Sequence, residues 1–186
     1  MNYFEIQRQP KPLQTVPFGS SISSSREANL PHNGFAMRRL HDGDLPQIER
    51  HLLDLGRLDR TTRFLGAHCD EVISAYVRRL DPSAAIMIGA FASSGRLLGF
   101  AEAQPAEAKD AIEIAVTVAG DQRRKGLGKE LVARVIELAF ATGARQAEFN
   151  FDPSNEAIVR LISSLGGKFG LPFGQATISS VASAKH

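Results

Sequence analysis

A basic segment with glycines stands out in the second half of the chain. It follows the apolar stretch 111–118 and contains Arg123, Arg124, Lys125, Gly126, Gly128 and Lys129. A helical spacing of apolar residues begins at Leu127, and the first amides of a helix have no acceptor within the helix. Glycine lets the backbone come close to a ligand because no Cβ stands in the way. The sequence therefore predicts a phosphate-binding turn at a helix N-terminus, with cationic side chains around it.

Glu113 is a carboxylate in an unusual position. In the strand predicted for residues 111–118, Glu113 points to the face opposite Ile114. It then faces either solvent, as a surface side chain of the sheet, or a cleft. In a cleft it could act as a general base. Glu102 and Glu148, in the neighbouring predicted strands, are secondary candidates for this role.

The segment 123–128 has the form Arg-x-x-Gly-x-Gly and lies between a predicted strand and a predicted helix. It resembles the acyl-CoA signature of the GCN5-related N-acetyltransferases, the GNAT superfamily. The resemblance implies an acetyl-CoA site in which the turn binds the pyrophosphate and the preceding strand pairs with the pantetheine arm. The turn residues are Arg123, Arg124, Lys125, Gly126, Leu127, Gly128 and Lys129, and the strand residues are Val116 and Val118. The alternative is a strand-to-helix turn that needs glycine and carries solvated basic residues. No Gly-x-x-x-x-Gly-Lys-Ser/Thr pattern is present, which argues against a nucleotide-hydrolysing P-loop.

The resemblance bears on further positions. Asn155 begins a predicted helix where many GNAT proteins have an Asn that contacts the pantetheine or the sulfur end, although Asn is also a common helix-start residue. Several members, including bacterial protein-lysine acetyltransferases, have a general base at a place similar to Glu113. Many also have a tyrosine acid seven residues after the helix Asn, where this chain has Ile162. Residues 58–66 resemble the Arg-x-x-Arg-Phe segment of the protein-acetylating members; the alternative is a basic, amphipathic helical turn.

Apolar periodicity predicts a regular alternation of elements from Gly34 onward. Strands are expected at 35–40, 85–92, 97–103, 111–118 and 146–151, with a terminal hairpin at 168–173 and 175–181. Helices are expected after the N-cap Asp44, from about Asp70 to Asp81, from about Leu127 to Gly143 and after Asn155. This order is the one expected for a GNAT domain. The resemblance implies an α/β GNAT acyl-CoA N-acyltransferase fold, with a mixed, mostly antiparallel sheet and helices on both faces.

The domain is expected to cover residues 34–186. Residues 1–33 are rich in proline and serine, and we expect an N-terminal extension that is flexible or docked on another surface.

The composition argues against several classes of protein. The net charge of +2 is too small for a general nucleic-acid binder. The longest apolar run, 84–92, is too short to span a membrane, and the N-terminus lacks the apolar segment of a secretion signal. The single cysteine, Cys69, cannot form an internal disulfide, which favours a cytoplasmic location. Its neighbour His68 would not face it on a helix or strand, so no Cys–His nucleophile is expected. The five histidines show no metal-ligand spacing, so no metal is expected.

The sequence thus predicts an acetyl-CoA-dependent N-acetyltransferase in which an amine attacks the thioester directly and Glu113 accepts its proton. The residues do not identify the acceptor, which is a small molecule or a protein lysine, and neither nucleic acid nor a membrane is expected as a partner. Whether the protein forms a homodimer is an open question at this point. The alternative is a GNAT domain that binds acyl-CoA as a regulatory ligand without turning it over, an alternative that the absent tyrosine keeps open.

Overall fold

A sheet of seven strands forms the centre of the molecule, as seen in a computed structural model that describes residues 34–66, 68–171 and 174–180. The predicted extension, 1–33, lies outside the described residues. The strands are β1 (Ala36–Arg39), β2 (Ile86–Phe91), β3 (Leu97–Pro105), β4 (Ala111–Val118), β5 (Gln146–Asn150), β6 (Lys168–Phe169) and β7 (Gln175–Ser179). Their order in the sheet is β1-β2-β3-β4-β5-β7-β6. Neighbours are antiparallel except for β4 and β5, which are parallel. The predicted mixed, mostly antiparallel sheet is confirmed.

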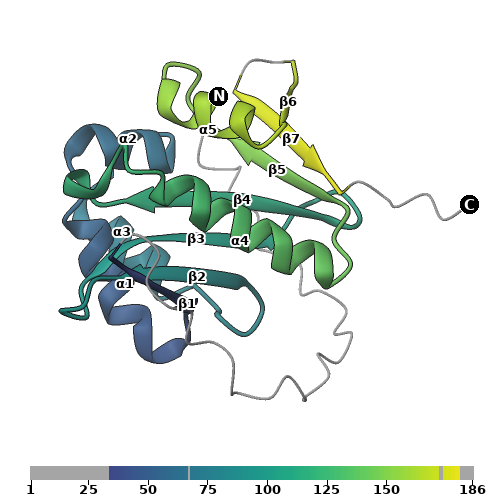
Figure 1. Cartoon of the computed structure of the whole chain (residues 1–186). Coiled ribbons are helices and arrows are strands. Elements are labelled where there is room, and N and C mark those ends of the chain that lie inside the picture. Colours follow the sequence, from purple (N-terminus) through teal and green to yellow (C-terminus); the bar gives the residue numbers. More distant parts are fainter. Residues whose placement is uncertain (1–33, 67, 172–173, 181–186) are drawn as a thin grey trace, which may run out of the picture.

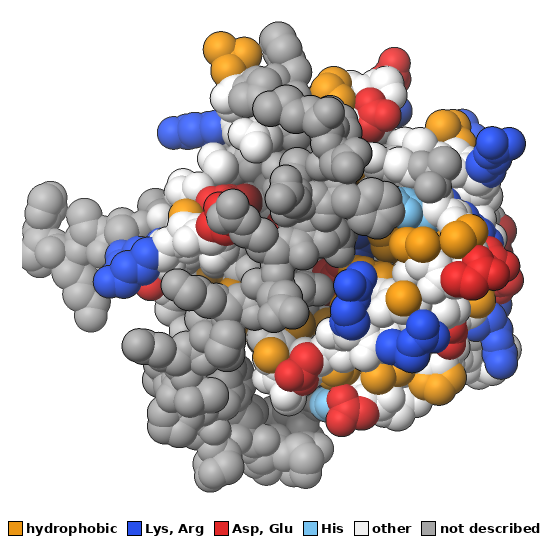
Figure 2. Space-filling view, turned by 180° about the vertical axis from the view of Figure 1, so that it is seen from behind, with side chains coloured by type: hydrophobic (Ala, Val, Ile, Leu, Met, Phe, Trp, Pro, Cys, Tyr) orange, Lys and Arg blue, Asp and Glu red, His pale blue; other side chains and the backbone are white. Residues whose placement is uncertain are grey.

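Helices lie on both faces of this sheet, as predicted. They are α1 (Leu45–Leu53), α2 (Arg57–Phe64), α3 (Asp70–Val77), α4 (Leu127–Ala141) and α5 (Glu156–Ser164), with short 3-10 turns η2 (Asp42–Asp44) and η3 (Gly120–Gln122). Figure 1 shows α4 lying across the sheet. Figure 2 shows the molecule from behind, where basic, acidic and apolar side chains are interspersed on the side of α1–α3.

The two faces of the sheet bury two separate cores, and alternate residues of β2 supply both. Ile88 and Ala90 pack in a core with the apolar side of α4. Met87 and Phe91 pack in a second core with α1 and α3. This alternation follows from the two-residue period of a strand and requires β2 to be apolar throughout.

Two local predictions are wrong. The expected order has two helices after the first strand, whereas the structure has three. The predicted element order left out α2, although an amphipathic helical turn was the alternative interpretation of residues 58–66. The helix is short and none of its residues is fully buried, so its apolar periodicity is weak. Asp44 precedes α1 as predicted, but its carboxylate does not cap the helix. It accepts hydrogen bonds from the Arg38 guanidinium at 2.7 and 2.8 Å instead.

The parallel strands β4 and β5 separate after a short paired stretch. Their pairing covers Ala111–Glu113 of β4 and 146–148 of β5. Beyond Glu113, β4 is paired with β3 alone within the described residues, and this one-sided pairing continues to Val118. We call residues 114–118 the open edge of β4. The open edge leads along the chain to the turn before α4.

Candidate functional site

The chain turns sharply between β4 and α4. Arg124 and Gly126 have φ angles of 57° and 84°, in the left-handed region that side chains other than glycine rarely adopt. Gly126 is the N-cap residue of α4. A Cβ built on Gly126 would meet no atom within 4 Å, so its surroundings are open. Glycine here serves the backbone angle and leaves space in front of the helix.

The first amides of α4 have no acceptor in the part of the chain that the structure describes. The first paired amide is that of Glu130, which donates to the Gly126 carbonyl at 3.2 Å. The amides of Leu127, Gly128 and Lys129 therefore stay available, and the 15-residue helix adds the partial positive charge of its N-terminus. Leu127, which is buried, anchors this end of the helix in the core. A helix N-terminus with unpaired amides therefore follows the turn, and phosphate binding there stays a prediction.

The cationic side chains of the turn differ in their partners. Arg124 and Lys129 are exposed and have no ion-pair partner among the described residues. Lys125 Nζ donates to Gln122 Oε1 at 3.3 Å. Arg123 is engaged twice. Its guanidinium pairs with Asp59 of α2 at 2.5 Å, and its Nε donates to the Val118 carbonyl at 3.4 Å. Arg123 thus already has an anionic partner, unlike Arg124 and Lys129.

The open edge of β4 lies directly before this turn. Val116 and Val118 direct their side chains toward the α4 core, and they face Ala101 and Gly99 of β3. Within the described residues no strand covers their other side. The backbone predicted to pair with an extended pantetheine arm is therefore free of a partner strand.

Glu113 lies where the open edge begins. It is exposed and stands opposite Glu148 at the last parallel pair between β4 and β5. Asn150 Nδ2 donates to Glu113 Oε1 at 3.1 Å. Its neighbour on the other side is Gln104 of β3. Glu113 therefore lies among polar side chains with one carboxylate oxygen hydrogen-bonded, and it has no ion-pair partner among the described residues.

Glu102 is the buried carboxylate on the same face of the sheet. It is 3% exposed, pairs with Arg63 of α2 and accepts hydrogen bonds from the Tyr76 hydroxyl and from Gln104 at 3.2 Å. Burial raises the pKa of Tyr76 well above its usual value, so the phenol stays protonated and donates. Sequence reasoning named Glu102 as a secondary base candidate but missed this cluster. The Arg-x-x-Arg-Phe segment was the only sequence signal for it.

A buried pair on this face joins α1 to β4. His51 Nε2 lies 3.0 Å from Thr117 Oγ1, and both residues are less than a tenth exposed. Burial lowers the pKa of His51 to about 4, against a hydrogen bond to the backbone of Leu97. The ring is therefore neutral at pH 7. If its other nitrogen donates to the Leu97 backbone, Nε2 accepts the hydroxyl proton of Thr117.

Asn155 and Ile162 occupy opposite ends of α5. The Asn155 side chain accepts from the Ile158 amide at 3.3 Å, which is the helix-start role considered for it. Its side-chain NH₂ stays available as a donor, with no acceptor among the described residues. Ile162 is fully buried in the core. A hydrophobic side chain therefore lies seven residues after Asn155, where the resemblance stated above implied a tyrosine acid.

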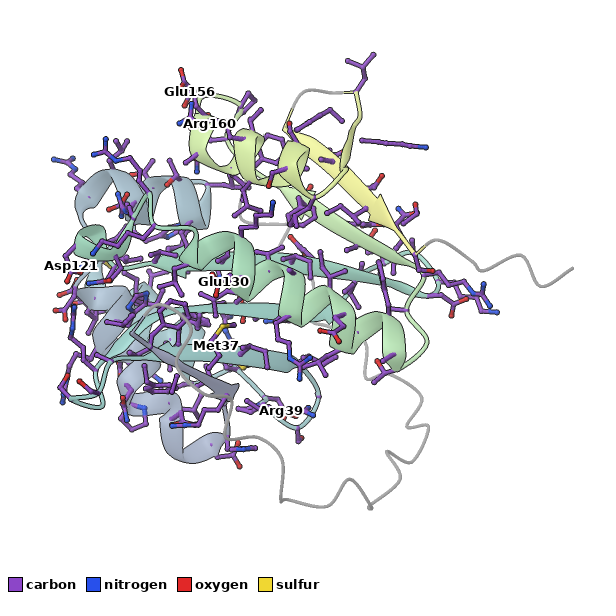
Figure 3. All side chains as sticks on the ribbon, in the orientation of Figure 1. Met37, Arg39, Asp121, Glu130, Glu156 and Arg160 are labelled. Carbon is purple, nitrogen blue, oxygen red and sulfur yellow. The ribbon has the colours of Figure 1, made fainter. Side chains whose placement is uncertain are left out.

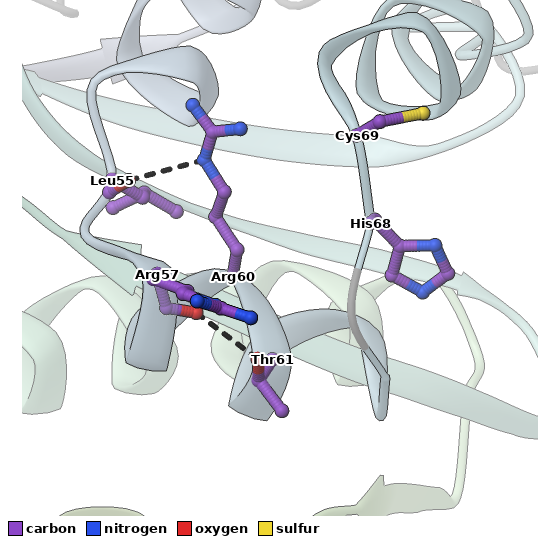
Figure 4. A pocket seen from close by; sticks show the side chains of 6 residues that line it. All are labelled: Leu55, Arg57, Arg60, Thr61, His68 and Cys69. Atoms are coloured by element: carbon purple, nitrogen blue, oxygen red, sulfur yellow. Dashed lines mark hydrogen bonds between the residues drawn. The ribbon is translucent and has the colours of Figure 1, made fainter.

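A hollow of about 520 Å³ lies along α2 and the segment before α3 (Figure 4). None of the predicted catalytic or acyl-CoA-binding residues lines it. Its lining is Leu55, Arg57, Arg60, Thr61, His68 and Cys69. His68 Nε2 lies 3.1 Å from the Phe64 carbonyl and the ring packs edge-on against Phe64. Arg60 pairs with Asp70 at 2.5 Å. These side chains are therefore engaged in local contacts.

No group of three or more His, Cys, Asp or Glu side chains in the described ranges is arranged to hold a metal ion. Of the helices described, none has the length and apolar character needed to cross a membrane.

Comparison with known proteins identifies the family. A family model described as the acetyltransferase (GNAT) family matches residues 50–166, which is more than half of the chain. The chain belongs to the GNAT family. The matched range includes Glu113, the open edge of β4 and the whole turn before α4. No curated protein matches the chain by sequence.

Solved GNAT structures share the fold. The GNAT domain of PAT from S. lividans is 15% identical, with a TM-score of 0.67 over 78% of this chain and 90% of that one. A phosphinothricin acetyltransferase from Sinorhizobium meliloti, solved with AcCoA, is 15% identical, with a TM-score of 0.60 over 78% and 88%. Spermidine N-acetyltransferase from Vibrio cholerae, solved with CoA and spermine, is 17% identical, with a TM-score of 0.61 over 80% and 96%. At these identities the likeness shows the fold alone.

Proposed function

We propose that this GNAT protein is an acetyl-CoA-dependent N-acetyltransferase that moves an acetyl group to a primary amine of a small molecule or a protein lysine. One observation carries the proposal. The open edge of β4 leads from a carboxylate, Glu113, to a turn with free amides and cations before α4. A long thioester with a phosphate end fits such a track, because the open edge offers backbone groups and the turn offers anion-binding groups.

The proposed acyl-CoA site has two parts. Phosphate is bound by the backbone of Gly126, Leu127 and Gly128 at the helix N-terminus. The cationic side chains around it are Arg123, Arg124, Lys125 and Lys129. Charge-assisted hydrogen bonds of this kind contribute roughly 1.5–3 kcal/mol each. The pantetheine arm pairs with the backbone of Val116 and Val118, and the NH₂ group of Asn155 is a further donor on its path.

The chemistry follows from direct attack. The amine nitrogen bonds to the thioester carbonyl carbon, and the C–S bond breaks as the tetrahedral intermediate collapses. Glu113, directly or through water, accepts the proton that the amine must lose. Backbone amides near Val116 stabilise the oxyanion. The thiolate leaves without a protein acid, because a thiol with a pKa near 8.5 is a tolerable leaving group and water can supply its proton.

A regulatory acyl-CoA-binding module is the second candidate. Ile162 is fully buried in the core, and Tyr76, the tyrosine of the described residues, is engaged with Glu102. No tyrosine hydroxyl of the described residues is therefore free to protonate the leaving thiolate.

An acceptor screen separates the two candidates. Thiol release from acetyl-CoA would be followed with polyamines, aminoglycosides, amino acids and lysine peptides, and the one thiol of exposed Cys69 would be subtracted as background. The proposal predicts amine-dependent turnover with at least one class. Acetyl-CoA binding without turnover by any class would favour the regulatory module.

A further inference from the structure

Ion pairs hold α2 in place together with one apolar side chain, Phe64, which packs against the second core and edge-on against Tyr76. The helix has eight residues, none of them buried, and Leu58 is 75% exposed. Asp59 pairs with Arg123 of the turn, Arg60 with Asp70 at the start of α3, and Arg63 with Glu102 of β3. Arg60 also donates to the carbonyls of Leu53 and Leu55.

The side of α2 that carries Asp59 and Arg63 spans the open edge of β4. These residues are four apart, so they lie on one side of the helix. Asp59 reaches Arg123, which also donates to the Val118 carbonyl at the end of β4. Arg63 reaches Glu102, which stands opposite Ala115. Figure 1 shows α2 beside the start of α4.

We propose that Asp59 is a positioning residue that couples acyl-CoA binding to α2. The inference rests on the proposed function, because it requires acyl-CoA phosphate at the turn. Phosphate draws the Arg123 guanidinium away from Asp59, and α2 loses its tie to the turn. The α2 helix lies on the face of the sheet that carries Glu113. Acyl-CoA binding therefore loosens α2 on the face from which the acceptor amine attacks.

The relative strengths of the contacts favour this exchange. The Arg123 and Asp59 side chains are 42% and 29% exposed. Such an exposed pair changes an equilibrium constant by a factor of up to about five. A charge-assisted contact to phosphate changes it roughly ten- to hundred-fold. The Arg63–Glu102 pair is buried, with side chains 13% and 4% exposed, and stays in place. Acyl-CoA therefore breaks the ion pair of Asp59 with Arg123, while the ion pairs of Arg60 and Arg63 stay in place.

A double-mutant cycle tests the exchange. The variants are Asp59→Asn, Arg123→Gln and both together, and the readout is the Kd of acetyl-CoA by titration calorimetry. Asp59→Asn should tighten binding about two- to five-fold in the wild-type background, because Arg123 no longer has to leave a partner. When Arg123 is already glutamine, the same change should give only the small gain expected from the loss of one negative charge. An equal gain in both backgrounds would mean general electrostatics and would overturn the proposal.

Asp121→Asn is the matched control. Asp121, labelled in Figure 3, lies in the same turn and pairs with Arg96 at 2.6 Å, away from α2. Its loss changes the net charge by the same amount, so it measures the general electrostatic gain. The gain from Asp59→Asn should exceed that from Asp121→Asn.

Hydrogen exchange of residues 57–64 tests the coupling in the wild-type protein. Saturating acetyl-CoA should speed amide exchange in α2, and in Asp59→Asn exchange should already be fast and unchanged by the ligand. Slower or unchanged exchange in the wild type would overturn the coupling and leave the proposed function standing. If acetyl-CoA gives no binding heat with folded wild-type protein, the proposed function itself fails, and the coupling fails with it.

Discussion

Glu113 faces Glu148 across the last parallel pair of β4 and β5, at the point where the two strands separate. The Asn150 amide donates to Glu113, whereas Gln146 donates to Glu148 at 3.1 Å. The two carboxylates lie on the same face of the sheet. Glu113 directly precedes the open edge in β4, whereas Glu148 belongs to the neighbouring strand β5.

Glu113→Gln should separate proton transfer from acyl-CoA binding. Glutamine keeps the size of the side chain and can still accept from Asn150, but it has little affinity for a proton. We expect an almost unchanged Kd for acetyl-CoA and a fall in turnover of about 10²–10⁴ at neutral pH. Part of the loss should return at higher pH, where more amine is already deprotonated. The measurement is a pH–rate profile with an amine identified in the acceptor screen.

Glu148→Gln is the comparison for this prediction. It removes a carboxylate from the same face of the sheet and preserves its size. A loss of turnover confined to Glu148→Gln would transfer the role of base to Glu148, and full activity of Glu113→Gln would remove Glu113 from the mechanism.

Arg63→Met should destabilise the fold, because it leaves the buried carboxylate of Glu102 without its cation. Breaking a buried ion pair on one side typically costs about 3–5 kcal/mol. For a domain of this size that corresponds to a fall in melting temperature of roughly 10 °C. Glu137→Gln breaks the exposed Arg134–Glu137 pair and should change the melting temperature by much less. Equal shifts for the two variants would argue against a structural role of the buried pair.

Acid should destabilise the protein through His51. The folded-state pKa of about 4 lies below the value near 6.5 of an exposed histidine. Below pH 6.5 the unfolded chain takes up a proton that the folded protein excludes. The free energy of unfolding therefore falls as the pH drops from about 6.5 to about 4, by roughly 3 kcal/mol from this group, and is independent of it at higher pH.

The double variant His51→Leu/Thr117→Val removes this titration and the buried hydroxyl together. Urea unfolding at several pH values should give a shallower dependence for the variant over pH 4–6.5. Other acid-sensitive groups, such as the Arg38–Asp44 pair, contribute to both proteins and cancel in the difference. Parallel curves would show that His51 is protonated in the folded protein or is exposed.

Deletion of residues 1–33 should leave acetyl-CoA binding intact. The groups proposed for acyl-CoA lie within 113–155, and the described sheet begins at Ala36. We expect the truncated protein to fold, by circular dichroism, and to bind acetyl-CoA with an unchanged Kd. A loss of folding or a large loss of affinity would place the segment within the domain or its assembly.

Local features of the fold and the site were predictable from the sequence, and tertiary ones were not. Gly126 and the apolar spacing from Leu127 are local signals, so the turn and α4 were predicted correctly. The α2 helix has no fully buried residue, and ion pairs with distant residues supplement the packing of Phe64, so the sequence indicated at most a helical turn there. His51 and Thr117 are 66 residues apart, and Arg63 and Glu102 are 39 apart. Only the folded sheet brings such pairs together.

The central claim is that the turn before α4 is an acyl-CoA site. Calorimetric titration with acetyl-CoA tests this claim most directly, by comparison of Gly126→Asp with Gly143→Asp. Both glycines have positive φ, at 84° and 106°, and a Cβ on either meets no atom within 4 Å, so the two changes strain the backbone similarly. They lie at opposite ends of α4. The wild type and Gly143→Asp should bind acetyl-CoA at one site, whereas Gly126→Asp should not bind, because its carboxylate faces the phosphates. Folded wild-type protein that gives no heat at near-millimolar acetyl-CoA, or equal binding by the two variants, would contradict the claim.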